Sequence, residues 1–330
     1  MKKLAASVLA FTASMAVAQA DEISPAVVYD MGGKFDRSFN EGVYNGVEQF
    51  REETGIDYRE FEVTNEGQRE QALERMARAG SDIVIAVGFA QAPPLEDVAA
   101  RYPDTMFTII DAVVDAPNVQ SIVFKEHEGS FLVGVLAAMA SETGAVGFIG
   151  GMDIPLIRNF ECGYEQGAVH QNPDIEVIAN MTGTTPAAWN DPARGGELAR
   201  SQFDRGADVI FAAAGGTGVG VYQAAEDTGN LAIGVDSNQN HLHPGTMLTS
   251  MVKRVDVAAY NAFTDAMNGD WEPGVLNLGL AEEGVGWALD EHNEDLITDE
   301  MRDRVEEVRD SIIAGDLNVV SYHENNACEY

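Results

Sequence analysis

The most constraining feature of this sequence is a regular alternation of short apolar segments with amphipathic helical segments between residues 25 and 235. Apolar segments such as 82–87 and 208–213 are almost continuously hydrophobic and do not alternate with polar residues. Strands of that kind are buried on both faces, as they are in a parallel sheet that helices cover on both sides. The pattern therefore predicts an α/β fold with parallel sheets.

The alternation runs twice along the chain. Residues 25–124 and 143–235 have a similar length and a similar order of expected strands and helices, so each run is sufficient for one doubly wound domain. The few elements expected after residue 245 are too few for a third domain, and we expect them to complete the two sheets. The chain would then cross more than once between two lobes, which form a hinged pair with a cleft between them. The predicted boundaries are 21–124 with 239–275 for the first lobe, and 125–238 with 276–330 for the second.

The N-terminus has the three parts of a secretory signal peptide over residues 1–20. Two lysines form a positive segment, residues 4–17 are mostly apolar, and the last three residues form a small-x-small cleavage site. We therefore predict cleavage after Ala20 and a periplasmic protein. No cysteine lies near the cleavage site, so a lipid anchor is not expected, and no later segment reaches the roughly 18 apolar residues of a membrane helix.

The charge of the chain excludes several partners. The 330 residues include 54 acidic and 20 basic ones, which gives a net charge of −34, and loss of the two signal-peptide lysines makes it −36. Phosphate contacts need clustered lysines and arginines, so binding to nucleic acid is not expected, and an anionic membrane surface would repel the protein. Most of the acid must coat the surface, as in proteins from salty surroundings.

Cys162 and Cys328 are the only two cysteines in the sequence. Because an exported protein meets an oxidising compartment, we predict a disulfide between them, with two free buried thiols as the alternative. The bridge would tie the C-terminus to the middle of the chain. In the chain-entropy model so long a loop contributes on the order of 5 kcal/mol.

Ligands of parallel α/β sheets bind beyond the carboxyl ends of the strands, so the residues that follow each expected strand are candidates for a site. The first strand leads into the segment Asp30 to Asn40, which holds carboxylates, an amide and two aromatic rings. Within it, Ser38 is expected to cap the next helix, in a capping box with Glu41. The candidates from all strand ends are Asp30, Ser38, Phe39, Asn40, Gly88, Asp111, Trp189, Gly216, Asp236 and Lys253.

Some of these candidates have a purely structural alternative. Asp111 follows a buried strand and would accept hydrogen bonds from a ligand or cap a turn. Trp189 lies in a polar loop and would stack on a flat ligand or pack at the hinge. Asp236 and Lys253 offer an acceptor and a donor that suit a polyol.

The motifs of common catalytic sites are missing from the sequence. It has no GxxxxGK[ST] phosphate loop, no GxSxG elbow and no HExxH motif. His241 and His243 lie two residues apart, but no cysteine or acid completes a metal site with them. We therefore expect no catalytic residue, no cofactor and no metal. The enzyme alternative is an exported hydrolase that uses Asp30, Asp36 and Asp111.

The segment at 30–40 has the pattern D-x-G-G-x-x-D-x-S-F-N, and it resembles the signature of the basic-membrane-protein family. The family consists of periplasmic substrate-binding components of ABC transporters with the type I bilobed fold. The resemblance covers most of the chain after the signal peptide. Further matching segments are Glu126-His127-Glu128-Gly129-Ser130, Trp189-Asn190-Asp191-Pro192, Gly215-Gly216-Thr217-Gly218, Gly234-Val235-Asp236 and Lys253.

The resemblance implies a purine nucleoside as the ligand and a membrane permease as the partner. It implies that the base lies between Phe39 and Trp189, that Asn40 and Asp111 bind the base edge, and that Asp236 and Lys253 bind the ribose. Asp30, Ser38 and Gly216 would line the same cleft. A different ring-containing ligand or a sugar is the alternative ligand. With a nucleoside as substrate, the enzyme alternative becomes an exported nucleoside hydrolase.

Lys253 is the one firmly basic residue among the strand-end candidates, which favours a neutral nucleoside over a nucleotide. We expect hinge closure of the two lobes over the ligand, and we expect a monomer.

Overall fold

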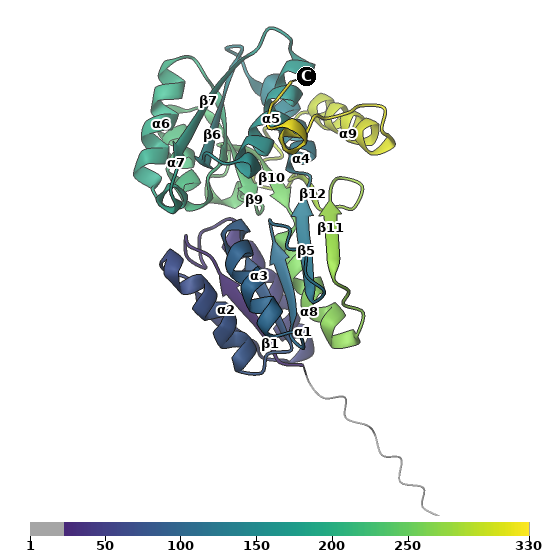
Figure 1. The fold of residues 1–330 in the computed structure, drawn as a ribbon. Helices are drawn as coiled ribbons and strands as arrows, with labels where there is room; N and C mark the ends of the chain where they lie inside the picture. Colours follow the sequence, from purple (N-terminus) through teal and green to yellow (C-terminus); the bar gives the residue numbers. More distant parts are fainter. Residues whose placement is uncertain (1–22, 330) are drawn as a thin grey trace, which may run out of the picture.

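The computed structural model describes residues 23–329, and the predicted signal peptide lies outside the described residues. These residues form two lobes, one above the other, which meet along a narrow boundary (Figure 1). The alternation of strands and helices predicted for residues 25–235 is present. The short elements β12 and α10 near the C-terminus were not predicted.

The first lobe contains a sheet of six parallel strands in the order β11-β5-β4-β3-β1-β2. The strands are β1 (Pro25–Tyr29), β2 (Arg59–Glu62), β3 (Ile83–Val87), β4 (Met106–Ile110), β5 (Val119–Phe124) and β11 (Gly274–Leu278). The helices are α1 (Phe39–Thr54), α2 (Arg69–Arg78), α3 (Ala92–Arg101) and α8 (Val255–Asn268). Alternate residues of β1 belong to different apolar clusters, so the sheet is covered on both faces.

The second lobe contains a sheet in the order β12-β10-β9-β8-β6-β7, in which only β12 is antiparallel to its neighbour. The strands are β6 (Ala145–Met152), β7 (Glu176–Gly183), β8 (Val209–Ala213), β9 (Leu231–Asp236), β10 (Met247–Lys253) and β12 (Val285–Trp287). The helices are α4 (Glu126–Ala140), α5 (Pro155–Gln171), α6 (Pro192–Asp204), α7 (Gly218–Thr228), α9 (Asp299–Ala314) and α10 (Tyr322–Asn325).

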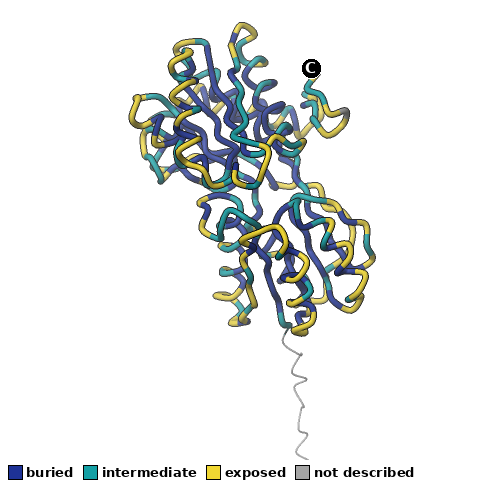
Figure 2. Tube along the Cα trace, turned by 60° about the vertical axis from the view of Figure 1, so that its left-hand side comes forward, coloured by how far each residue is buried: buried dark blue, intermediate teal, exposed yellow. Residues whose placement is uncertain are grey.

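The interior of each lobe is formed by these strands, which Figure 2 shows as buried segments beneath more exposed helices. Every residue of β1, β3 and β8 is buried. The near-continuous apolar runs of the sequence are therefore the central strands of two doubly wound sheets, as predicted. None of the helices within residues 23–329 combines the length and the apolar character of a membrane span.

Three crossings join the lobes, between β5 and α4, between β10 and α8, and between β11 and β12. The crossing segments are hydrogen-bonded to one another, since Lys125 N donates to Leu278 O at 3.0 Å and Arg254 N donates to Gly284 O at 2.8 Å. A hinge of several crossing segments was expected, and these hydrogen bonds connect the three segments to one another.

The structure differs from the predicted lobe boundaries in the last third of the chain. Residues 239–275 were assigned to the first lobe, but β10 lies within that range and pairs with β9 in the second sheet. Conversely, β11 extends past the boundary at residue 275 and pairs with β5 in the first sheet. The apolar pattern of a strand indicates that the strand is buried, but it does not indicate which sheet the strand joins.

The C-terminal segment is fixed to α5. Cys162 and Cys328 form the predicted disulfide, with their Cα atoms 5.5 Å apart. Helix α5 in turn packs closely on α4, because Gly163 and Gly167 face the backbone of α4 so closely that a Cβ atom on either would collide with it. This packing places the start of α4 and the middle of α5 beside the hinge.

Candidate ligand-binding cleft

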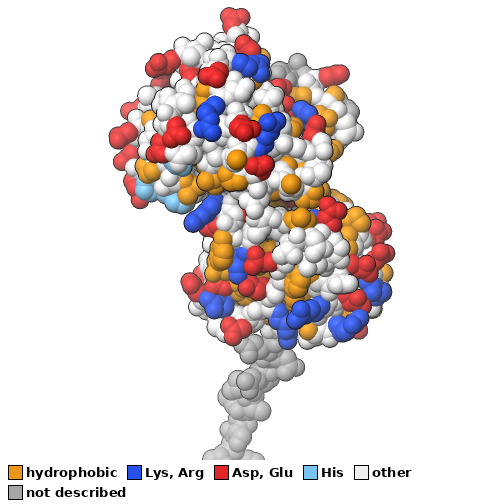
Figure 3. Space-filling view, turned by 90° about the vertical axis from the view of Figure 1, so that its left-hand side faces the viewer, with side chains coloured by type: hydrophobic (Ala, Val, Ile, Leu, Met, Phe, Trp, Pro, Cys, Tyr) orange, Lys and Arg blue, Asp and Glu red, His pale blue; other side chains and the backbone are white. Residues whose placement is uncertain are grey.

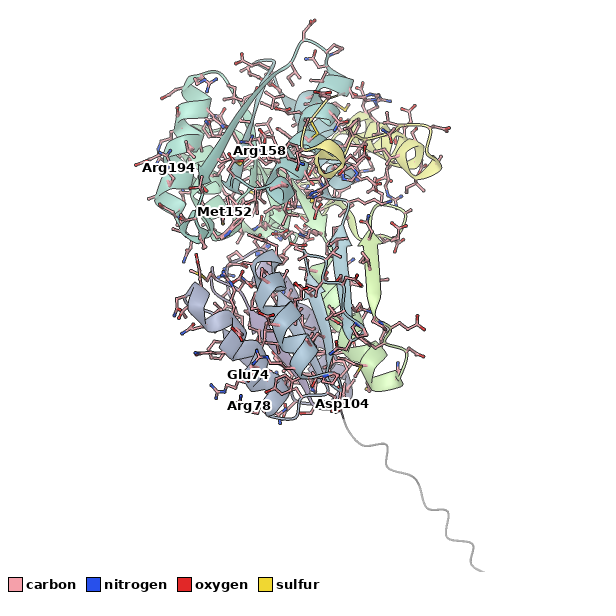
Figure 4. The ribbon with its side chains drawn as sticks, in the orientation of Figure 1. Glu74, Arg78, Asp104, Met152, Arg158 and Arg194 are labelled. Carbon is pink, nitrogen blue, oxygen red and sulfur yellow. A yellow bond between two sulfur atoms is a disulfide. The ribbon has the colours of Figure 1, made fainter. Side chains whose placement is uncertain are left out.

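A cavity lies between the lobes, at the carboxyl ends of the strands of both sheets. Figure 3 shows hydrophobic side chains gathered along this boundary, whereas charged side chains dominate the outer surfaces. Met152 ends β6 on the side of the second lobe that faces the first (Figure 4). The cavity is lined by Asp30, Met31, Asp36, Phe39, Asn40, Gly88, Phe89, Asp111, Leu156, Ile157, Phe160, Trp189, Ala213, Gly215, Val235, Asp236 and Lys253.

The loop between β1 and α1 is ordered by Asp36 and not by the predicted capping box. Asp36 accepts hydrogen bonds from the backbone N–H groups of Ser38, Asn40 and Glu41 at 2.9–3.1 Å. Burial raises the pKa of Asp36 to about 6, although the backbone N–H groups at the helix start favour its charged form. The capping-box prediction was wrong because the Ser38 hydroxyl makes no cap hydrogen bond.

The Ser38 hydroxyl instead reaches across to the second lobe. It donates to Asp236 Oδ2 at 2.5 Å, where Asp236 is the last residue of β9. Two more bonds join the same loops, from Ser237 Oγ to Ser38 O at 3.0 Å and from Gln239 Nε2 to Arg37 O at 2.6 Å. These three bonds form an interlobe latch, which connects the loop before α1 to the loop after β9.

Two residues that line the cavity carry a buried acceptor with no hydrogen-bond partner among the described residues. One is Asn40 Oδ1, whose orientation is set because Asn40 Nδ2 donates to Asp36 Oδ2 at 3.1 Å. The other is Asp111 Oδ1, on a residue with a positive φ of 71° directly after β4. A buried acceptor left without a donor costs about 1–3 kcal/mol. Both residues line the cavity, so donors of a ligand would satisfy both acceptors.

Lys253 is the one basic residue that lines the cavity. Its ammonium group donates to Asp111 Oδ2 at 2.6 Å and lies 3.8 Å from Glu126 Oε1. Burial opposes its charge, but the carboxylates of Asp111, Glu126 and Asp236 together outweigh burial and raise the pKa of Lys253. Lys253 is therefore a buried cation at neutral pH, and it is 2% exposed.

Aromatic rings enter the cavity from both lobes. Phe39 comes from the first lobe, and its ring centre lies 5.1 Å from the Lys253 ammonium nitrogen. Trp189 comes from the second lobe, at the end of a 3₁₀ turn (Pro186–Trp189). Gly151 seats the indole, because a Cβ atom at that position would overlap the ring of Trp189. The two aromatic rings that were expected on either side of a ligand thus belong to opposite lobes.

Two of the predicted site residues do not line the cavity. Ser38 belongs to the interlobe latch, and Gly216 lies beside the backbone oxygen of Trp189 while its neighbour Gly215 lines the cavity. Gly88 does line it, with a φ of 96° that favours glycine. Asp30 lines the cavity and also pairs with Arg69 at 2.9 Å.

The whole fold and this cleft agree with one known family. Residues 23–322 match the family model named Bmp, described as ABC transporter substrate-binding protein PnrA-like. The chain belongs to the Bmp family. The resemblance of the segment at 30–40 to basic membrane proteins is thereby confirmed.

The similarity of this Bmp protein to its relatives extends over most of its sequence. An uncharacterized lipoprotein of Pyrococcus abyssi is 34% identical over an alignment of 289 positions, which covers 82% of this chain and 70% of that protein. The crystal structure of an ABC transporter solute-binding protein from Aeropyrum pernix is 31% identical, with a TM-score of 0.85 over 92% of this chain and 95% of that chain. The lac repressor, at 13% identity, aligns with a TM-score of 0.61 over 83% of each chain and shares the fold alone.

Membership of the Bmp family makes this chain a substrate-binding protein and not an enzyme. The nucleoside-hydrolase alternative was therefore wrong. Consistent with that, Asp30 forms an ion pair with Arg69, and Asp36 accepts hydrogen bonds from the backbone N–H groups at the start of α1. Neither carboxylate is therefore free for acid–base catalysis.

Several residues of the Bmp cleft were not among the predicted candidates. Leu156, Ile157 and Phe160 come from the first turns of α5, and Glu126 contacts Lys253 from the start of α4. The α5 residues do follow a strand of the second sheet, and that position in the chain is the signal that could have identified them. Glu126 begins a segment that was matched to the family by sequence, but no role was predicted for it.

Proposed function

We propose that this protein binds a purine nucleoside between its lobes and delivers it to the membrane permease of an ABC transporter. The two unpartnered acceptors, Asn40 Oδ1 and Asp111 Oδ1, are the observation that supports this proposal most directly. They call for a ligand edge that carries N–H donors, such as the amino and ring N–H groups of a purine.

The apolar lining supports a flat ligand. Phe39 from the first lobe and Trp189 from the second offer aromatic faces on either side of the cavity, and Phe160 adds a third ring. Stacking on such faces and the exclusion of water stabilise a bound base and discriminate little between bases. The two acceptors would therefore carry the selectivity.

The polar end of the cavity suits a ribose. Asp236 and Lys253 both line the cavity, so a carboxylate acceptor and an ammonium donor are available to hydroxyl groups. Among the described residues, the Lys253 ammonium group has one hydrogen bond, to Asp111, so its other N–H groups are available to a ligand oxygen. Charge-assisted bonds of this kind are about twice as strong as bonds between neutral groups.

The charge of the cavity disfavours nucleotides. Asp30, Asp36, Asp111 and Asp236 line it, and Lys253 is the single cation among the lining residues. A phosphate group would face several carboxylates with one counter-charge, so its desolvation would be poorly compensated. A neutral nucleoside avoids that cost.

Binding would proceed by hinge closure. The three crossings beside the cavity allow the lobes to separate, and the interlobe latch would form only when they close. We infer that the permease recognises the closed form on the extracytoplasmic side. The predicted signal peptide and the lipoprotein relative of Pyrococcus abyssi support a periplasmic location. A monomer is the expected state, since a net charge of −34 opposes self-association.

Isothermal titration calorimetry of the purified chain tests this proposal. The ligands are inosine, guanosine and adenosine, their free bases, ribose, and the corresponding monophosphates. We expect nucleosides to bind more tightly than free bases or ribose alone, and monophosphates to bind weakly or not at all. Chromatography of the recovered nucleoside should show that it is intact. Tight binding of a monophosphate or a sugar with no response to any nucleoside would contradict the proposal.

A further inference from the structure

The ammonium group of Lys253 is surrounded by more charge than its single hydrogen bond requires. Asp111 accepts its hydrogen bond from the first lobe, while Glu126 Oε1 lies 3.8 Å away on the side of the second lobe. The rings of Phe39, Phe124 and Phe160 surround the same nitrogen at 5.1–5.6 Å. Glu126 does not line the cavity, so it would not touch a ligand itself.

Glu126 is the first residue of α4 and directly follows the crossing at Lys125. It is 1% exposed, and its other carboxylate oxygen accepts a hydrogen bond from Asn159 Nδ2 at 2.9 Å. Because α4 packs against β10, Glu126 stays with Lys253 when the first lobe moves. Asp111 belongs to the first lobe and would move away from Lys253 on opening.

Asn159 holds Glu126 in place and is itself held by the C-terminal segment. Asn159 Oδ1 accepts bonds from Ser321 Oγ and Tyr322 N, both at 3.0 Å, so the orientation of its amide is fixed. The side chain is fully buried on α5, one turn before Cys162 and its disulfide. A continuous polar chain therefore runs from the tethered C-terminal segment through Asn159 and Glu126 to Lys253.

Core packing alone does not account for this carboxylate. A buried acid with one side-chain amide donor, its own backbone N–H and an ammonium group beyond hydrogen-bond distance is poorly compensated, and an apolar residue of similar size would serve the core better. The other titratable groups beside it are Asp111, which also binds Lys253, and His127, which contacts Asn159. His127 Nδ1 lies 3.2 Å from Asn159 Nδ2, and burial lowers the pKa of His127 to about 4, so this ring is neutral at neutral pH. Glu126 is thus placed to act on Lys253.

We propose that Glu126 is a positioning residue for ligand binding, which holds the Lys253 ammonium group at the cleft so that it meets Asp111 and the ligand when the lobes close. The proposal rests on the proposed function, because the ligand used to test it is a nucleoside. Asn159 supports the same position one step further from the ligand.

The test compares Glu126→Gln, Lys253→Met and the double variant by nucleoside titration at pH 8. Glu126→Gln keeps the shape and the bond to Asn159 but removes the charge. We expect its affinity to fall about tenfold and that of Lys253→Met to fall further, with no additional loss in the double variant. Glu165→Gln is the matched control, because Glu165 is a half-buried acid on α5 outside the cleft, and it should bind within about twofold of the original protein.

A second readout needs no ligand. In protein labelled with ¹⁵N at the lysine side chains, the Lys253 signal is assigned as the one that is missing from Lys253→Met. That signal should shift in Glu126→Gln and should be unchanged in Glu165→Gln. Glu126→Asp, which keeps the charge but withdraws it by one methylene, should give an intermediate shift and an intermediate affinity, and it replaces Glu126→Gln if that variant does not fold.

The two proposals fail in different ways. If the original protein binds no nucleoside, the proposed function is wrong, and the Lys253 signal still decides the role of Glu126. If the original protein binds and Glu126→Gln binds equally well with an unmoved Lys253 signal, the positioning role is wrong. Losses that add up in the double variant would also overturn it, because they would show that Glu126 acts independently of Lys253.

Discussion

Lys253 donates to Asp111 at 2.6 Å and thereby joins the last residue of β10 in the second sheet to the residue after β4 in the first. Both side chains are at most 5% exposed. A buried pair of this kind is costly to break one-sidedly, because the remaining charge loses its compensation. The pair therefore couples the closure of the lobes to the ligand, which would share both groups.

Asp111→Asn tests this coupling with a side chain of the same shape. The variant loses one charge beside Lys253 and exchanges one acceptor for a donor. We expect nucleoside affinity to weaken by about 2–5 kcal/mol, the range for truncating one partner of a buried charge pair. Titration calorimetry gives the affinity. Asp104→Asn, in a turn at the far end of the first lobe, should bind as the original protein does (Figure 4).

Trp189→Ala should weaken nucleoside affinity by about 1–3 kcal/mol, the value of one base stacked on an aromatic side chain. Trp189→Phe should keep most of the affinity, because a smaller ring still offers a face. The intrinsic fluorescence of the original protein should change on binding, and Trp189→Phe should abolish most of that change. Trp287→Phe, which alters a tryptophan outside the cavity, should leave the change in place. An unaltered affinity in Trp189→Ala would mean that the indole only packs on Gly151.

The order of the strands and helices could be predicted because hydrophobic periodicity is a local property of the sequence. The runs that became β3 and β8 are continuous in apolar residues, and both are central strands. Sheet membership is not local, which is why β10 was assigned to the wrong lobe. Its partner β9 precedes it in the chain, and nothing in its own residues identifies that pairing.

The candidate site could be predicted in outline from the rule that ligands bind at strand ends. Asp111, Asp236 and Lys253 each directly follow or end a strand, and the structure brings all three to the cavity. The role of Ser38 was predicted wrongly because capping is a local contact, whereas its hydroxyl bonds Asp236 nearly two hundred positions away. Glu126 escaped prediction for the same reason, since its effect depends on the distant Lys253.

Ser38→Ala should shift the protein toward the open form. The change removes the hydroxyl that donates to Asp236 across the lobes. It leaves intact the hydrogen bond from the Ser237 hydroxyl to the backbone oxygen of residue 38. We expect affinity to weaken by about 1.5–3 kcal/mol, the value of a hydrogen bond to a charged group. Small-angle scattering should show a larger radius of gyration than for the original protein at subsaturating nucleoside. Ser311→Ala on α9, whose hydroxyl donates within its own helix, is the control and should match the original protein in both measurements.

Removal of the disulfide tests the tether of the C-terminal segment. The bridge closes a loop of 166 residues, for which the chain-entropy model gives on the order of 5 kcal/mol as an upper value. Cys328→Ser should therefore lower the urea midpoint of unfolding. A reducing agent should lower the midpoint of the original protein and leave that of Cys328→Ser unchanged. Equal midpoints for the oxidised protein and the variant would show that the bridge adds nothing to stability.

The pH dependence of stability should separate the binding role of Glu126 from a structural one. Burial raises the pKa of Glu126 from 4.5 to about 7, against the attraction of Lys253. The folded protein therefore holds a proton on Glu126 that the unfolded chain has already released, and this contribution to stability is lost as the pH rises from about 4.5 to about 7.

Glu126→Gln lacks this loss, so its free energy of unfolding relative to the original protein should increase across the same pH range by about 1–3 kcal/mol. Urea unfolding at pH 4.5, 6 and 8 measures the difference, and Glu197→Gln, at an exposed acid paired with Arg194, serves as a second control. A positioning residue predicts a variant that is more stable at pH 8 and binds less tightly, because the buried charge is unfavourable to folding and useful only for the ligand. A variant that loses stability and affinity together would instead assign Glu126 to the framework of the hinge.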